Sequence, residues 1–295
     1  MTDTSLTERH LFCFGYGFSA RALVALLQGT GELWRVSATV RNADKQTLLE
    51  KDGVTPVVLQ SGVGLPDGVL EGVTHVLLSA PPETDGSDPV LAFARETLSQ
   101  CRSLKWVGYL STTGVYGDHG GAWIDEETPS GPVGARGWRR QKAEAAWAAT
   151  GLPMHYFRLA GIYGPGRNSL QSLRQGTARR ITKPGQVFSR IHVEDIAQIL
   201  QASINHPNPG RAYSVCDDLP APPQEVVSYA AALLDMEPPP ETAFEDAELS
   251  PMARSFYGEN KRIRNDRIKQ ELGIKLKYPT YREGLAALLA QEKQV

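Results

Sequence analysis

The sequence predicts a doubly wound α/β fold, in which helices cover both faces of a mostly parallel sheet. Short apolar runs that are typical of buried strands alternate with stretches of helical periodicity through the first half of the chain. The composition, 41% hydrophobic and 22% charged residues in a chain of 295, is that of an ordinary globular protein. This length accommodates one domain and a smaller lobe.

The expected elements follow in order along the chain. Apolar runs predict strands at 10–14, 36–40, 55–59, 75–80, 106–111 and 211–216, and a strand with its exit at 154–164. Helical periodicity or composition predicts helices at 20–28, 136–150 and 191–204. The last of these ranges begins with the end of a strand. Because parallel strands need crossover connections, usually helices, this alternation predicts βαβ units.

A change of character after Asp217 predicts a second, smaller lobe. Proline-rich connectors surround one helical stretch at 226–234, and the segment 166–186 is polar and basic. We therefore expect a larger domain from 1–165 with 187–217, and a smaller substrate lobe from 166–186 with 218–295.

Charge and cysteine content narrow the classes of function. A net charge of −2 argues against a nucleic-acid partner, and the basic stretch 261–272 carries an apolar helical face instead. The three cysteines are far apart, so we expect core thiols and no metal site. The polar amino terminus and the lack of any run near ~18 apolar residues predict a cytoplasmic protein without a membrane partner.

A glycine-rich loop follows the first expected strand. Gly15, Gly17 and Ala20 form a G-x-G-x-x-A pattern that opens a helix. Gly15 permits the tight turn, Gly17 admits a pyrophosphate, and Ala20 allows close helix packing. With Phe18, these residues form the expected cofactor loop of a Rossmann fold. The alternative is an ordinary glycine turn.

The second expected strand ends at Arg41, where NAD enzymes usually carry an acidic residue for the ribose hydroxyls. A guanidinium there suits a 2′-phosphate, so NADP is favoured over NAD. Arg21 is a possible helper, and a surface arginine without contacts is the alternative. Ser79 and Ala80 end the fourth strand before two prolines, where they would line the cofactor.

Several later segments resemble signatures of the extended short-chain dehydrogenases, the family that contains sugar-nucleotide epimerases and dehydratases. The matching segments are LSTTGVYGDHGGAWIDEETP (110–129), RLAGIYGPGR (158–167) and RIHVEDIA (190–197). The end of the chain, 261–285, resembles a less characterised atypical subgroup. The resemblance implies that Leu159 and Ala160 line the nicotinamide, and that Thr112 binds the substrate oxygen.

The family's Tyr-x-x-x-Lys pair is incomplete in this alignment, because the chain reads Trp138-Arg139-Arg140-Gln141-Lys142. The indole N–H of Trp138 donates hydrogen bonds and cannot act as a general base. Lys142 keeps the family role of binding the nicotinamide ribose, unless it is a solvent-facing helix lysine. Tyr109, Tyr116 and His119 are candidate replacement acids.

The resemblance leaves two hypotheses about function. The first is an NADP-dependent oxidoreductase or epimerase-like enzyme that acts on a small carbonyl or alcohol, a sugar-like molecule being one option, with Thr112 and Lys142 at the catalytic site. The second is a non-catalytic NADP(H)-binding sensor or scaffold, which the missing tyrosine motivates. The expected partner is a small molecule, and the expected state is a monomer or homodimer.

Overall fold

A computed structural model describes residues 9–41, 43–59 and 64–293. By compactness the chain divides into two units. The first comprises Met1–Ser111, Arg139–Phe157 and Ile196–Ala212; the second comprises Thr112–Trp138, Arg158–Asp195 and Tyr213–Val295. The expected assignment of 166–186 and 218–295 to a substrate lobe stays a prediction.

One seven-stranded sheet has the order β11-β7-β5-β4-β1-β2-β3. Its strands are β1 (Arg9–Phe14), β2 (Trp34–Val40), β3 (Thr55–Val58), β4 (His75–Leu78), β5 (Trp106–Thr112), β7 (Met154–Leu159) and β11 (Ala212–Val215). β1 runs parallel to β2 and β4, as do β2 to β3 and β4 to β5. The predicted doubly wound fold is confirmed, and the strand order reverses between β1 and β4, where such folds bind ligands.

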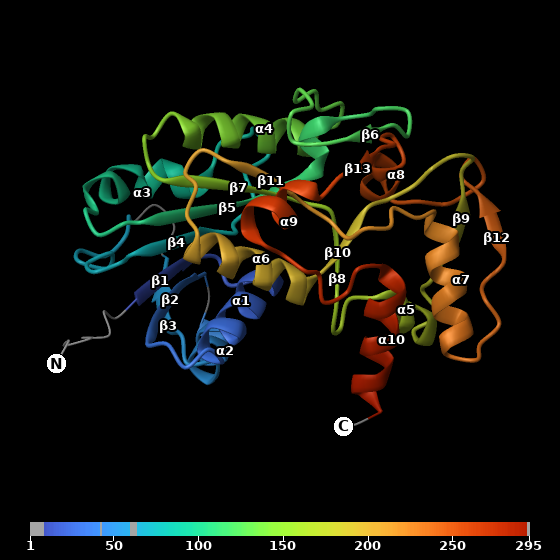
Figure 1. Ribbon diagram of the computed structural model, residues 1–295, viewed down its shortest axis with the longest axis horizontal. Coiled ribbons are helices and arrows are strands. Elements are labelled where there is room, and N and C mark those ends of the chain that lie inside the picture. Colours follow the sequence, from blue (N-terminus) through green and yellow to red (C-terminus); the bar gives the residue numbers. More distant parts are fainter. Residues whose placement is uncertain (1–8, 42, 60–63, 294–295) are drawn as a thin grey trace. The chain divides into compact units, whose positions relative to one another are not determined.

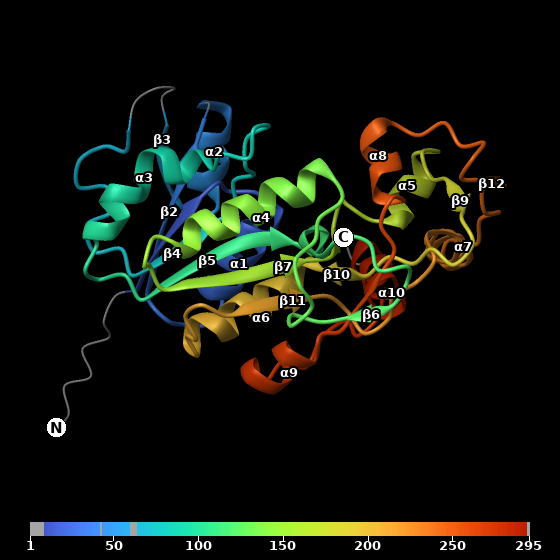
Figure 2. The ribbon, with the colours of Figure 1, turned by 90° about the horizontal axis from the view of Figure 1, so that it is seen from above.

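Helices lie on both faces of this sheet. They are α1 (Phe18–Gln28), α2 (Ala43–Lys51), α3 (Pro89–Gln100), α4 (Ala135–Ala148) and α6 (Val193–Asn205). Figures 1 and 2 show α3 and α4 over one face, with α1 and α6 on the other. The core under α3 and α4 joins strand residues such as Phe12, Phe14 and Tyr109 to Ala94 and Trp147 of the helices.

The second unit is built from short parallel strand pairs and helices. The pairs are β8 (Gly161–Tyr163) with β10 (Arg190–His192), β9 (Arg180–Thr182) with β12 (Glu241–Ala243), and β6 (Trp123–Ile124) with β13 (Arg262–Ile263). Its helices are η1 (Thr113–Tyr116), α5 (Ser169–Arg174), α7 (Pro223–Leu233), α8 (Pro251–Phe256), α9 (Asp266–Leu272) and α10 (Tyr281–Glu292). α5, α7 and α10 share one apolar core.

Residues 154–164, expected as a strand and its exit, form two strands, β7 and β8. The N–H of Ala160 donates to the carbonyl of Val215 (3.0 Å), whereas the N–H of Gly161 donates to Ser189 (3.1 Å). The chain therefore changes its hydrogen-bonding partner between these two residues. The apolar pattern alone carries no sign of this change.

Cys13 and Cys216 are buried and Cys101 is half-buried, and all three are free thiols. The expectation of core thiols therefore holds fully for two of them. Within the described residues, no three histidine, cysteine, aspartate or glutamate side chains gather as metal ligands would. None of the described helices has the length and apolarity to cross a membrane.

Gly137, in the first turn of α4, touches η1. A Cβ there would lie 2.3 Å from the carbonyl oxygen of Gly114 and 2.9 Å from Cβ of Pro132. Alanine usually stabilises a helix interior by roughly 1 kcal/mol relative to glycine. Here a backbone carbonyl stands in the way, so the steric clash outweighs helix propensity.

We therefore expect Gly137→Ala to lower the free energy of unfolding by about 1–3 kcal/mol, as overpacking does. Urea denaturation followed by circular dichroism measures this change. Gly134→Ala is the matched control, because its Cβ would meet only Glu259 Oε1 at an ordinary 3.6 Å. A Gly137→Ala protein as stable as the wild type would contradict this account of the contact.

Candidate cofactor site

The glycine loop joins β1 to α1 in the first unit. Gly15 adopts φ +90°, in the region that favours glycine. Its N–H donates to Thr39 Oγ1 (2.9 Å), and its carbonyl accepts from Ser79 Oγ (2.9 Å). A side chain at Gly15 would press on Ser79, because its Cβ would lie 2.9 Å from Ser79 Oγ. The ends of β2 and β4 thus fix the turn.

The start of α1 is open toward an anion. Gly17 is exposed, and a Cβ placed on it would meet no atom within 4 Å. α1 begins at Phe18 without a side-chain cap, so its first N–H groups can bind a ligand oxygen. Ala20 is only 1% exposed and lets the helix pack closely. These features fit the pyrophosphate of a dinucleotide.

Arg41 and Arg21 differ in the contacts that restrain their side chains. Arg41 follows the end of β2 and is exposed. Arg21 is paired with Asp52, whose Oδ2 lies 2.9 Å from Arg21 Nε and accepts from the Tyr16 hydroxyl at 3.1 Å. Burial and the nearby Asp52 carboxylate raise the pKa of Tyr16. Asp52 therefore restrains Arg21, whereas no described carboxylate is paired with Arg41.

The end of β4 continues the same edge of the first unit. The N–H groups of Ser79 and Ala80 both donate to the carbonyl of Phe14, at 3.0 and 3.1 Å. Further along this loop, the carbonyl of Asp85 accepts from Lys142 Nζ at 3.2 Å. Lys142 is exposed on α4, so the structure ties it to the loop that follows β4.

Thr112 ends β5 and caps η1, accepting from the N–H of Gly114 (3.2 Å). Leu159 ends β7, Ala160 follows it, and both are buried. In the second unit Tyr116 is 1% exposed, and its hydroxyl bonds Ser214 Oγ at 2.8 Å. Burial raises the pKa of Tyr116, which makes this tyrosine a poor proton donor or acceptor for a substrate.

The other two candidate acids, Tyr109 and His119, are also held by contacts within the protein. Tyr109 is fully buried in the first unit, and burial raises its pKa. A ring nitrogen of His119 lies 3.1 Å from the carbonyl of Tyr116. Neither arrangement presents an open acid at the end of β5.

Two arginines of the signature segments have structural contacts in the second unit. The guanidinium of Arg158 lies 4.9 Å above the ring of Tyr116. Arg190 Nη1 donates to the carbonyls of Phe188 (2.8 Å) and Ala221 (3.1 Å). Burial raises the pKa of nearby Asp217 to about 8, although Arg190 opposes that rise.

The face of α4 that meets the sheet was not predicted. Ala143 and Trp147 are buried, and Arg140 Nη1 donates to the carbonyl of Leu110 in β5. Trp138 is 47% exposed and lies four residues before exposed Lys142, on the side away from Arg140. The inward side chains therefore include Arg140. A helical wheel with Ala143 and Trp147 on its buried side would have predicted, from the sequence, which face of α4 meets the sheet.

No family model matches this chain, and no curated protein does. Among solved structures, a functionally unknown conserved protein from Silicibacter pomeroyi DSS is 53% identical, with a TM-score of 0.89, 97% of this chain covered and 99% of the other. The two proteins belong to one family. A candidate NAD-dependent epimerase/dehydratase from Methylobacillus flagellatus is 25% identical, with a TM-score of 0.67 and coverage of 97% and 98%.

A third solved structure is dTDP-glucose 4,6-dehydratase from Bacillus anthracis str. Ames in complex with NAD. It is 16% identical, with a TM-score of 0.74 and 97% of each chain covered. The chain has the extended short-chain dehydrogenase fold. The resemblance found in the sequence is confirmed at the level of that fold, which places the glycine loop of this chain where the fold reverses its strand order.

Proposed function

We propose that this chain binds NADP at the loop formed by Gly15, Gly17, Phe18 and Ala20, and that it acts as an oxidoreductase or epimerase-like enzyme on a small carbonyl or alcohol. The open Gly17 position ahead of uncapped α1 carries the proposal. The NAD complex of the Bacillus anthracis dehydratase, which shares the fold, supports a nicotinamide dinucleotide as the ligand.

We assign a separate role in binding or catalysis to each group of residues. The N–H groups at the start of α1 hold the pyrophosphate, and Arg41 meets the 2′-phosphate. Ser79, Ala80, Leu159 and Ala160 flank the nicotinamide half, and Lys142 binds its ribose. A nicotinamide held by these residues would supply or accept a hydride. Thr112 donates a hydrogen bond that polarises the substrate oxygen, and a water or an unassigned group moves the proton.

A non-catalytic NADP(H) sensor is the second candidate. Trp138 occupies the aligned position of the family's tyrosine and cannot exchange a proton at neutral pH. The buried hydroxyls of Tyr109 and Tyr116 have raised pKa values, which favours a site without a general acid. In this hypothesis cofactor occupancy itself is the signal.

Arg41→Asp tests the cofactor preference. We expect wild-type protein to bind NADPH more tightly than NADH, and the variant to lose about 10- to 100-fold in NADPH affinity, as for a hydrogen-bonded charge pair. Isothermal titration calorimetry measures both affinities. Arg102→Asp, at another exposed arginine of the first unit, is the charge-matched control. Wild-type preference for NADH would refute the assignment of Arg41.

Thr112→Val tests catalysis in a carbonyl screen followed at the nicotinamide absorbance. We expect turnover to fall by about 100-fold, because an oxyanion donor is lost, while NADPH affinity persists. Thr112→Ser restores the hydroxyl and Thr113→Val is the neighbouring control. Turnover that survives Thr112→Val would exclude the proposed role. Tight NADPH binding with no turnover of any substrate would favour the sensor.

A further inference from the structure

Arg190 holds one backbone contact of the second unit together. Phe188 and Ala221 form an isolated antiparallel bridge, in which the N–H of each residue donates to the carbonyl of the other, at 3.0 and 3.1 Å. Nη1 of Arg190 donates to both of these carbonyls, at 2.8 and 3.1 Å. Hydrogen bonds from a charged donor are the stronger kind, so the guanidinium stabilises both sides of the bridge.

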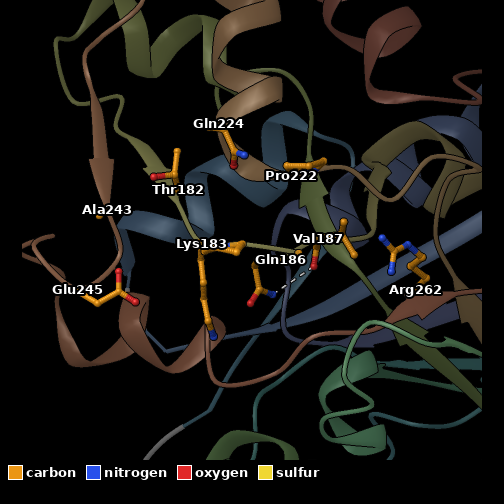
Figure 3. A pocket seen from close by; sticks show the side chains of 11 residues that line it. Thr182, Lys183, Gln186, Val187, Pro222, Gln224, Ala243, Glu245 and Arg262 are labelled. Atoms are coloured by element: carbon orange, nitrogen blue, oxygen red, sulfur yellow. Dashed lines mark hydrogen bonds between the residues drawn. The ribbon is translucent and has the colours of Figure 1, made fainter.

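The bridge borders a cavity of about 450 Å³ inside the second unit. Val187 precedes Phe188 in the chain, and Pro222 follows Ala221. Val187 and Pro222 both line the cavity, where Figure 3 shows their side chains. The positions of these two wall residues therefore depend on the bridge.

Asp217 lies next to Arg190 and is 1% exposed. Its backbone N–H donates to the carbonyl of Arg190 (2.6 Å). In its side chain, Oδ1 accepts from the N–H of Leu219 (3.2 Å), whereas Oδ2 is buried without a hydrogen-bond partner. An ionised carboxylate would leave a charged oxygen uncompensated there, so this geometry favours the neutral acid.

The charge of Asp217 changes in an accessible range of pH. Burial raises the pKa of Asp217 to about 8, although the nearby Arg190 opposes that rise. A group with a raised pKa stays protonated at neutral pH and ionises as the pH rises through that value. Asp217 is therefore neutral at about pH 7 and negatively charged at about pH 9.

Ionisation of Asp217 changes which acceptor Arg190 binds best. The guanidinium keeps its positive charge throughout this range of pH. In the structure it is bonded to two neutral carbonyls, and within the described residues it forms no ion pair with Asp217. A carboxylate is a stronger acceptor for a guanidinium than a carbonyl is. Rotation of Arg190 toward an ionised Asp217 would remove its donor from the bridge.

Other ionisable groups also face this pair. They are Asp218 and Cys216 beside Asp217, Tyr163 of β8, Tyr257 at the end of α8, and Tyr281 of α10. Burial raises the pKa values of Tyr163, Tyr257 and Cys216, so these three side chains stay neutral near pH 8. Asp218 is already paired with Lys269 (2.6 Å). Asp217 is therefore the carboxyl group that can gain a charge beside Arg190.

We propose that Asp217 and Arg190 form a proton-controlled latch on the wall of this cavity. While Asp217 is protonated, Arg190 holds the Phe188–Ala221 bridge closed. When Asp217 releases its proton to solvent, Arg190 turns to the new carboxylate and the bridge loosens, which frees Val187 and Pro222 to move. The latch lies within the second unit and requires no cofactor.

NMR spectroscopy of the full chain, without cofactor, tests the latch. Aspartate labelled with ¹³C at its carboxyl group gives the pH at which Asp217 ionises, and ¹⁵N labelling gives the protection of the Phe188 and Ala221 amides against hydrogen exchange. We expect ionisation near pH 8. Both protection factors should fall about tenfold between about pH 7 and about pH 9, the equivalent of one lost hydrogen bond.

The Gly164–Arg167 bridge, in the same unit, is the internal control. It should keep its protection factors, because Arg190 donates its hydrogen bonds to Phe188 and Ala221. A general loosening of the unit at high pH would lower the protection of both bridges equally, and that outcome would overturn the proposal.

Asp217→Asn keeps an acceptor for Leu219 but has no proton to lose, so its bridge should stay protected at about pH 9. Asp218→Asn is the matched control and should lose protection as the wild type does, since Asp218 is paired with Lys269. The wild-type titration decides the question even if Asp217→Asn does not fold. The proposal fails if Asp217 ionises below about pH 6, or if the bridge keeps its protection in the wild type or loses it in Asp217→Asn.

Discussion

The turn at Gly15 is the constraint on which the candidate cofactor site depends. Thr39 of β2 accepts from the N–H of Gly15, and Ser79, just after β4, donates to its carbonyl, so only a residue that tolerates φ +90° fits between them. The turn starts α1 at the point where the strand order reverses. A single backbone geometry therefore sets both the uncapped start of α1 and its place beside the ends of β2 and β4.

Helix α4 has one face toward the sheet and one face away from it. Its inward face is set by packing, with Trp147 buried and Arg140 bonded to β5. Trp138 and Lys142 lie on the other side. The spacing of a tryptophan and a lysine in the sequence therefore does not reveal which side chains of α4 face the sheet.

The sequence predicted the central sheet well because each buried strand is a continuous apolar run, as at 75–80 and 106–111. The turn at Gly15 was equally predictable, since its backbone geometry favours glycine. The second unit was not predicted in detail, because strands of two or three residues such as β6 and β13 are too short to show a periodicity. The hydrogen bond from Gln186 Nε2 to the carbonyl of Glu259 joins residues that are 73 positions apart, and a local sequence pattern cannot reveal such a contact.

Hydrogen exchange measured by mass spectrometry, with and without NADPH, tests the central claim that the glycine loop is the cofactor site. The account predicts that millimolar NADPH slows exchange in peptides that cover 14–21 and 78–82, which hold the start of α1 and the end of β4. Peptides from α7 should exchange as before. Unchanged exchange in both loop segments, or protection confined to the second unit, would contradict it.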